Sequence, residues 1–449
     1  MLSPLEKNAI TLENEISWVE KVLDTRMRLY FGKECEYKNI FEIEPPDLEK
    51  DESPYALCVK RFGMSHAERL IVMLALIPHI RPQLLDVFFT KNATYDKPFT
   101  EFGGVKGTYH LGFLPTCETA VFALAGNDLA LRFEVMDLFD SEYYLRKKQI
   151  IELETDKEKE PLMSAPLLLT REYLTMFTTG KKYNPNFSSS FPASRLETKM
   201  TWEDLVVEPE VMMGISEIKS WILYGNLLLN ELGMAKKIKR GFRSLFFGPP
   251  GTGKTLTASL LGKDTGLDVY RIDLSKIVSK YIGETEKNLA QVFDFAENKN
   301  WILFFDEADA LFGKRTTTKD SKDRHANQEV SFLLQRIEDF PGVVILATNL
   351  KNNMDEAFLR RFQSMIYFPQ PTPEMRYRLW KNAFSAVFEF EEKVDLKKLS
   401  KEYDISGGAI NNVARYCALK ALSRKNNKIL MEDLIQGIRN EYIKEGKTV

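Results

Sequence analysis

The chain has 449 residues, enough for two or three domains with buried cores, and its 44% hydrophobic and 28% charged content is ordinary for a globular protein. Its 62 basic and 64 acidic residues give a formal net charge of −2, so no overall positive field attracts nucleic acid. Four cysteines without C-x-x-C spacing argue against a zinc site or a disulfide framework, and the longest apolar run, residues 70–78, is too short to cross a membrane. These features favour a cytoplasmic location.

Residues 1–180 are predicted to form a mainly helical, mixed N-terminal domain, and a winged-helix element within it is left open. Residues 5–31 have helical periodicity, and Ser65 with Glu68 forms a capping-box pattern before an apolar helix at 69–80. Residues 181–200 are predicted as a linker, because turn-forming residues are dense there.

A phosphate-binding loop is predicted after the apolar strand at 243–247. Residues 248–255, Gly-Pro-Pro-Gly-Thr-Gly-Lys-Thr, match G-x-x-x-x-G-K-[ST], and a helical stretch follows them. In this arrangement backbone N–H groups and the positive end of the helix bind phosphate oxygens. Lys254 is expected to reach the β and γ phosphates and Thr255 to contact Mg²⁺. The predicted cofactors are therefore ATP and Mg²⁺.

A second apolar strand, residues 301–305, ends in the acidic pair Asp306 and Glu307. A carboxylate at this end of a strand beside a phosphate loop can hold Mg²⁺ through water, so Asp306 is assigned to the metal together with Thr255. Glu307 is placed to polarise the attacking water. A solvated surface pair is the alternative, which the preceding apolar strand disfavours. The residues predicted to bind the nucleotide are Gly248, Pro249, Pro250, Gly251, Thr252, Gly253, Lys254, Thr255, Leu256 and Asp306.

The strand order along the chain predicts an α/β nucleotide-binding subdomain at residues 201–370. Helical stretches separate the five strand candidates, as a parallel sheet requires. The candidates are 243–247, 268–273, 301–305, 343–348 and 364–369. From 371 to 449 the pattern changes to helices only, with Thr372 and Ser406 as N-caps, which predicts a small helical lid.

The phosphate loop followed by Phe-Phe-Asp-Glu-Ala-Asp-Ala-Leu-Phe at 304–312 resembles the AAA family of ring-forming ATPases, over roughly residues 200–445. The resemblance implies a P-loop NTPase core with a five-stranded sheet in the AAA order, a C-terminal lid and assembly into a homo-hexamer. It also implies that Asn349, after the strand at 343–348, contacts the γ phosphate or the attacking water. Arg360 and Arg361 would serve the nucleotide of the neighbouring subunit.

Lys280, Tyr281, Ile282 and Gly283 resemble the family's first pore loop, in which an aromatic side chain grips an extended polypeptide. A tyrosine and an isoleucine packed under a loop are the alternative reading. In such ATPases the N-terminal domain selects a protein client or an adaptor, and the same role is expected of residues 1–180.

Other features of the sequence indicate which kind of AAA ATPase the chain resembles. The sequence has one phosphate loop, which predicts a single ring. It has no H-E-x-x-H motif, so a protease in the same chain is not expected. Gly407 and Gly408 stand near the sensor 2 position, where no arginine occurs, as in the core AAA clade. The layout is also similar to AAA ATPases encoded beside bacterial contractile injection systems.

The expected function is ATP-driven remodelling, unfolding or disassembly of proteins. An ATP-dependent assembly switch without threading is the main alternative. A nucleic-acid motor or loader is disfavoured by the balanced charge and by the aromatic tripeptide at 281–283.

Overall fold

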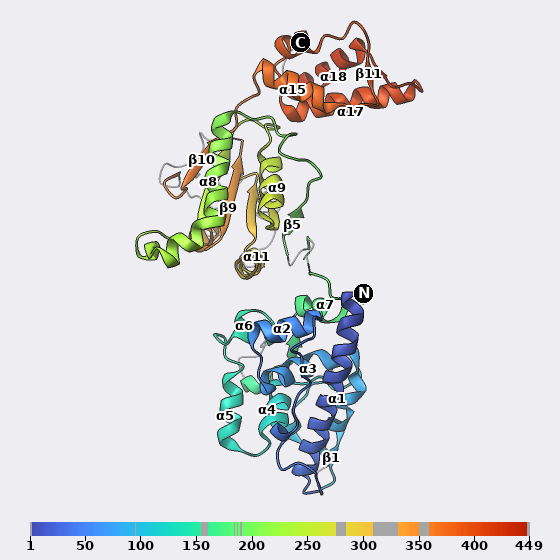
Figure 1. The fold of residues 1–449 in the computed structure, drawn as a ribbon, viewed down its shortest axis with the longest axis vertical. Helices are drawn as coiled ribbons and strands as arrows, with labels where there is room; N and C mark the ends of the chain where they lie inside the picture. Colours follow the sequence, from blue (N-terminus) through green and yellow to red (C-terminus); the bar gives the residue numbers. More distant parts are fainter. Residues whose placement is uncertain are drawn as a thin grey trace, which may run out of the picture. The chain divides into compact units, whose positions relative to one another are not determined.

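The protein is represented by a computed structural model that describes residues 2–94, 96–153, 160–183, 185, 187–188, 191–274, 284–308, 331–349 and 359–446. The chain divides into two compact units, Met1–Asn184 and Pro185–Val449 (Figure 1).

The N-terminal unit is mainly helical, as predicted, with two small antiparallel strand pairs, β1 with β2 and β3 with β4. Its helices are α1 (Pro4–Tyr30), α2 (Pro54–Phe62), α3 (His66–Ile80), α4 (Cys117–Ala125), α5 (Leu129–Asp137), α6 (Tyr144–Lys147) and α7 (Arg171–Thr179), and its strands are β1 (Lys91–Asn92), β2 (Lys97–Pro98), β3 (Ile151–Leu153) and β4 (Leu167–Leu169).

Helix α3 forms the centre of this unit. The Ser65 side chain accepts a hydrogen bond from the Glu68 N–H, and the Glu68 carboxylate accepts one from the Ser65 N–H, so the predicted capping box is present. Every residue from 68 to 77 is buried, which places the longest apolar run of the chain inside the protein. Among the described helices, none is by itself long and apolar enough to span a membrane; α3 together with the 3₁₀ helix η2 (Pro82–Phe89), bent by 105°, meets only the length and composition criteria.

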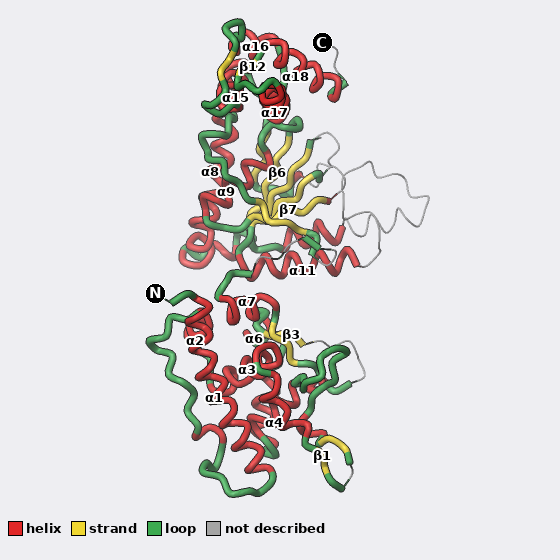
Figure 2. Tube along the Cα trace, turned by 90° about the vertical axis from the view of Figure 1, so that its right-hand side faces the viewer, coloured by secondary structure: helices red, strands yellow, loops and turns green. Residues whose placement is uncertain are grey.

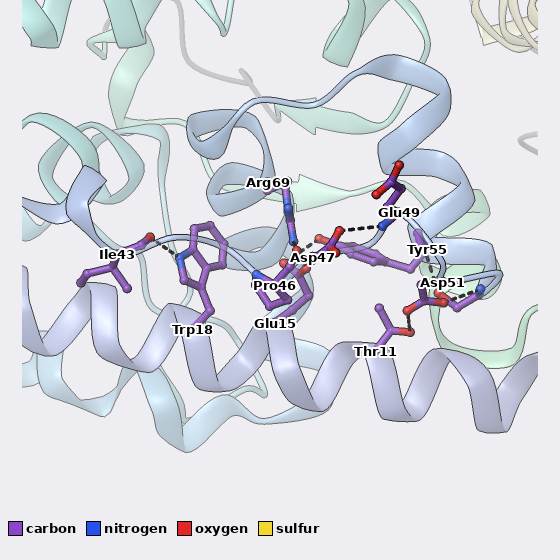
Figure 3. Close-up of polar contacts among 12 residues, drawn as sticks. Thr11, Glu15, Trp18, Ile43, Pro46, Asp47, Glu49, Asp51, Tyr55 and Arg69 are labelled. Carbon is purple, nitrogen blue, oxygen red and sulfur yellow. Dashed lines mark hydrogen bonds and ion pairs between the residues drawn. The ribbon is translucent and has the colours of Figure 1, made fainter.

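A buried polar cluster joins α1 to α3 (Figure 3). Glu15 on α1 is 0% exposed and forms an ion pair with Arg69 on α3. The Tyr55 hydroxyl donates to Glu15 Oε2 at 3.2 Å, and Arg69 Nη2 donates to the Pro46 carbonyl oxygen at 2.9 Å. The pKa of Glu15 is raised above its usual value, because burial outweighs the opposing effect of the hydrogen bonds from Arg69 and Tyr55. Each charge therefore depends on the other to remain inside the unit.

The second unit contains one six-stranded sheet in the order β10-β6-β9-β8-β7-β5. The five predicted strands are all present, mutually parallel and within two residues of their predicted limits. The strands are β5 (Ala193–Leu196), β6 (Phe242–Phe247), β7 (Val269–Asp273), β8 (Ile302–Asp306), β9 (Val343–Thr348) and β10 (Ser364–Tyr367). β5, which lies within the segment predicted as a linker, adds a sixth, antiparallel strand at the edge beside β7. Its four residues carry no apolar alternation that marks a strand, so the pairing depends on the exposed edge of β7.

Both faces of this sheet are buried. In β8, Leu303 and Phe305 contribute to one core, whereas Ile302 and Phe304 contribute to the other. α8 (Pro209–Asn226) and α9 (Lys254–Thr265) cover the second of these faces and lie on the same side of the strands in Figure 2. α11 (Glu284–Lys299) and the helical residues 331–339 supply the core on the opposite face. This double covering explains why the central strands are nearly continuous apolar runs.

The C-terminal part forms a small helical lid around its own core. Thr372 and Ser406 cap α15 and α17 as predicted, because their side chains accept hydrogen bonds from Met375 N and Ala409 N. A short parallel pair, β11 with β12, completes it. The elements are α15 (Pro373–Ala383), β11 (Glu389–Phe390), α16 (Leu396–Glu402), α17 (Gly407–Ser423), β12 (Lys428–Ile429) and α18 (Met431–Lys444).

Replacing one member of the buried pair should strongly destabilise the N-terminal unit. We expect Glu15→Gln or Arg69→Met to lower its free energy of unfolding by about 3–5 kcal/mol, because the remaining charge loses its partner inside the protein. The double variant should lose less than the sum of the two single losses. Urea denaturation of the full chain measures this difference.

The control is Glu13→Gln, which removes a glutamate of the same helix from an exposed ion pair with Arg81. It should leave stability nearly unchanged. Equal losses for Glu13→Gln and Glu15→Gln would contradict a special role for the buried pair.

Candidate nucleotide site

The predicted phosphate loop connects the end of β6 at Phe247 to the start of α9 at Lys254. Gly248 has φ +139°, and a Cβ there would lie 2.1 Å from the Phe368 carbonyl oxygen, so only glycine fits. Gly253, the N-cap of α9, has φ +103°. The backbone thus leads from the loop directly into the first turn of α9, the end of a helix at which N–H groups can bind an anion.

Lys254 is the centre of the site. Its side chain is buried, and its ammonium donates hydrogen bonds to the carbonyl oxygens of Gly248 at 2.7 Å and Pro249 at 2.8 Å. It also donates to Asn349 Oδ1 at 3.1 Å. Asn349 follows β9, the direct neighbour of β6, and this adjacency brings together two residues that are 95 positions apart.

A cavity of about 430 Å³ opens beside the loop. Most of the residues predicted to bind the nucleotide line it, namely Pro250, Gly251, Thr252, Gly253, Lys254, Thr255, Leu256 and Asp306, together with Asn349. Gly248 and Pro249 contribute instead through their carbonyl oxygens to Lys254. The volume lies within the range of small-molecule sites and is open to one nucleotide.

The oxygen donors suit Mg²⁺. Thr255, which carries a hydroxyl, and Asp306, which carries a carboxylate, both line the cavity. Mg²⁺ is usually bound by one or two protein oxygens together with water and substrate phosphates, and this pair meets that requirement. Arg271 on β7 lies beside Asp306, with Nε 2.9 Å from Oδ2. Sequence reasoning did not identify Arg271, because only the pairing of β7 with β8 makes the two residues neighbours.

Glu307 has an unusual backbone for a residue with a side chain. Its φ is +53°, in the left-handed region, directly after the last residue of β8. Its N–H donates to Asp306 Oδ1 at 3.0 Å, and the following Ala308 N–H donates to the Ala347 carbonyl oxygen of β9 at 3.0 Å. Pairing with β9 therefore continues past a strained residue, and such strain is concentrated at functional sites.

The predicted catalytic residues are not all gathered at the cavity. Among the described residues, Glu307, Arg360 and Arg361 do not line it. Arg360 and Arg361 are exposed, and the Arg361 guanidinium forms an ion pair with Glu338. The predicted pore-loop residues Lys280, Tyr281, Ile282 and Gly283 lie outside the described residues.

The lid contacts the phosphate loop through glycines. The Gly408 N–H donates to the Gly251 carbonyl oxygen at 2.9 Å, and a Cβ at Gly408 would lie 3.1 Å from Gly251 Cα. Gly251 has φ +74°, and a Cβ there would lie 2.6 Å from the Ser406 hydroxyl oxygen. The close approach favours glycine at position 408, and the left-handed φ favours glycine at position 251.

Sequence reasoning also missed part of the cavity wall. Residues 204–208, which precede α8, line it together with Met375 and Leu379 of the lid. These apolar and acidic residues carry no local signal for a ligand, because their role arises only when the lid and the entry segment meet at the loop.

Comparison with known proteins also identifies ATPase relatives for the central part of the chain. A model of the ATPase family associated with various cellular activities (AAA) matches residues 244–370. An uncharacterised AAA family ATPase of Sinorhizobium fredii is 31% identical over 226 residues, which cover 47% of this chain and 66% of that protein.

Two further relatives have more informative names. A proteasome-activating nucleotidase of Archaeoglobus fulgidus is 34% identical over 202 residues, covering 43% of this chain and 50% of the relative. The peroxisomal ATPase PEX6 of Debaryomyces hansenii is 29% identical over 280 residues, covering 58% of this chain and 22% of the relative. The chain thus matches less than two thirds of the length of each of these proteins.

Removing the ammonium at position 254 should abolish tight nucleotide binding. We expect Lys254→Met to weaken binding of a fluorescent ATP analogue about 10- to 100-fold, since one charge-assisted hydrogen bond is worth about 1.5–3 kcal/mol. Lys263→Met is the matched control in the same helix, because Lys263 is exposed and donates to the Met200 carbonyl oxygen. A similar affinity for the two variants would place the phosphates elsewhere.

Proposed function

The chain belongs to the AAA family of ATPases, and on this premise we propose that it hydrolyses MgATP at the Gly248–Thr255 loop to remodel protein substrates. The observation that carries the proposal is the contact of Lys254 with Asn349 at the wall of the cavity. This contact brings the phosphate loop next to a polar side chain that can hydrogen-bond to the γ phosphate.

Each residue at the loop has a chemical task in this proposal. Lys254 exchanges its carbonyl partners for β and γ phosphate oxygens, and Thr255 and Asp306 hold the metal ion directly or through water. When bound, Mg²⁺ would supply positive charge beside the phosphoryl group. Glu307 accepts a proton from the attacking water, and Asn349 orients that water or the γ phosphate. Positioning and charge stabilisation, rather than a covalent intermediate, then account for the rate.

We further propose that the site is completed by a neighbouring subunit in a homo-hexamer. The support is the separation seen within one chain, in which the exposed Arg360 and Arg361 stand outside the cavity. A guanidinium supplied in trans stabilises the transition state and contributes ~10³–10⁵ in rate in well-studied phosphoryl-transfer enzymes. Arg361 would have to leave its ion pair with Glu338 to serve in this way.

The proposed substrates are proteins. One relative is named for activating the proteasome and another for the peroxisome, and the aromatic tripeptide at 281–283 resembles a polypeptide-gripping pore loop. In this proposal the N-terminal unit recruits a client or an adaptor, and hydrolysis pulls the client past Tyr281.

Replacing the proposed base should separate binding from hydrolysis. We expect Glu307→Gln to lower the steady-state ATPase rate at least about 100-fold, because general-base catalysis contributes ~10²–10⁴. Its affinity for ATP should stay close to that of the wild type, since the amide is isosteric. Glu297→Gln, a change at an exposed position on α11, should leave both quantities unchanged. An active Glu307→Gln enzyme would remove Glu307 from the mechanism.

Replacing the proposed pore aromatic should separate hydrolysis from mechanical work. We expect Tyr281→Ala to retain most of the ATPase activity but to lose unfolding of a client captured by the Glu307→Gln variant. Tyr281→Phe keeps the ring and should retain both activities. If Tyr281→Ala remodelled the client at the wild-type rate, the threading hypothesis would be wrong, and an ATP-dependent assembly switch would be favoured.

A further inference from the structure

Helix α5 of the N-terminal unit has apolar residues on two opposite faces. Leu131, Val135 and Leu138 follow one face at spacings of four and three residues, and these three positions are buried or partly buried. α5 contacts α4 at the left-hand edge of the unit in Figure 1, and Val135 and Leu138 pack in the core of the unit. One apolar stripe is what a surface helix needs to join a core.

The second stripe faces away from the unit. Leu129, Phe133 and Met136 have the same four- and three-residue spacing but are displaced by two residues, about 200° around the helix. Their exposed fractions are 61%, 58% and 38%. A helix that is apolar on both faces is normally buried on both, so we call Leu129, Phe133 and Met136 the outer stripe and ask what covers it.

The charge around the outer stripe is acidic. Residues 127–142 contain five acids and a single base, Arg132. The charge of Arg132 is matched by Glu118, which lies 2.6 Å from its Nη2. Asp128 is the N-cap of α5, and Glu134 and Asp137 lie along the flank of the stripe. Asp140 and Glu142 follow the end of the helix, where Glu142 forms an ion pair with Lys147.

This charge pattern selects among possible partners. An anionic lipid surface or a nucleic acid would bring phosphates against the acidic residues. A second copy docking stripe to stripe would also bring acids against acids. A protein segment with basic residues around an apolar stripe of its own would satisfy both the apolar residues and the charges.

We propose that the outer stripe of α5 is the docking site for a basic amphipathic helix of a partner protein. Leu129, Phe133 and Met136 pack against apolar residues of that helix, and its Lys or Arg side chains pair with Glu134 and Asp137. Phe133, central and aromatic, is the main anchor. This assignment gives a chemical class to the recruitment that the proposed function places in the N-terminal unit.

The test measures binding of synthetic helices to the full chain by fluorescence anisotropy, without ATP. The probe is a labelled peptide of ~15 residues, about four turns, with Leu at i, i+4 and i+7 spacing and Lys elsewhere. One comparison peptide has Glu in place of Lys, and another has the Leu–Lys composition scrambled. We expect both to bind at least about tenfold more weakly than the probe.

Substitutions on the protein locate the site. Phe133→Ser and Asp137→Lys should each weaken probe binding at least about tenfold. The matched controls are Leu57→Ser, at an exposed apolar position on α2, and Glu20→Lys, at an exposed acidic position on α1; both should bind the probe like the wild type. An unchanged thermal unfolding profile shows that each variant is folded.

The proposal is overturned if Phe133→Ser binds the probe like the wild type, if Leu57→Ser weakens binding equally, or if the Leu–Glu peptide binds as well as the Leu–Lys peptide. These outcomes are independent of remodelling activity, because no nucleotide is present. A chain that binds the probe through α5 but remodels no protein would disprove the proposed function alone.

Discussion

The hydrogen bonds of the Lys254 ammonium unite the nucleotide site. Its three acceptors come from two places: the carbonyl oxygens of Gly248 and Pro249 belong to the loop after β6, and Asn349 Oδ1 follows β9. A buried ammonium requires such oxygen partners, and in the proposed function phosphate oxygens would replace them. The parallel pairing of β6 with β9 sets this distance, because the carboxyl ends of parallel strands meet at one edge.

The lid depends on that loop in turn. The Gly408 N–H donates to the Gly251 carbonyl oxygen at 2.9 Å, and a Cβ at Gly408 would lie only 3.1 Å from Gly251 Cα. This backbone hydrogen bond ties the position of α17 to that of the loop. Residues of the lid and of the segment before α8 share the wall of the same cavity.

The N-terminal unit is organised around a buried apolar helix and a buried ion pair. Its centre is α3, and the Glu15–Arg69 pair is inside the protein, where each charge is stable only with its partner. On its surface, α5 presents an apolar stripe that the unit's own core does not use. A centre held together by a buried ion pair, combined with an exposed apolar face on α5, is suited to holding a recognition surface in a fixed shape.

The local elements were predictable from the amino-acid sequence alone: the strand–loop–helix at 243–265, the acidic end of β8, the caps at Ser65, Thr372 and Ser406, and five strands of the sheet. Each is encoded by neighbouring residues through spacing, capping and turn chemistry. Four further features emerge only in the folded protein: the contact of Arg271 with Asp306, the strand β5 at the edge, the lid glycines against Gly251 and the exposure of the second face of α5. These depend on residues far apart in the chain, whose meeting is set by strand pairing and packing rather than by local pattern.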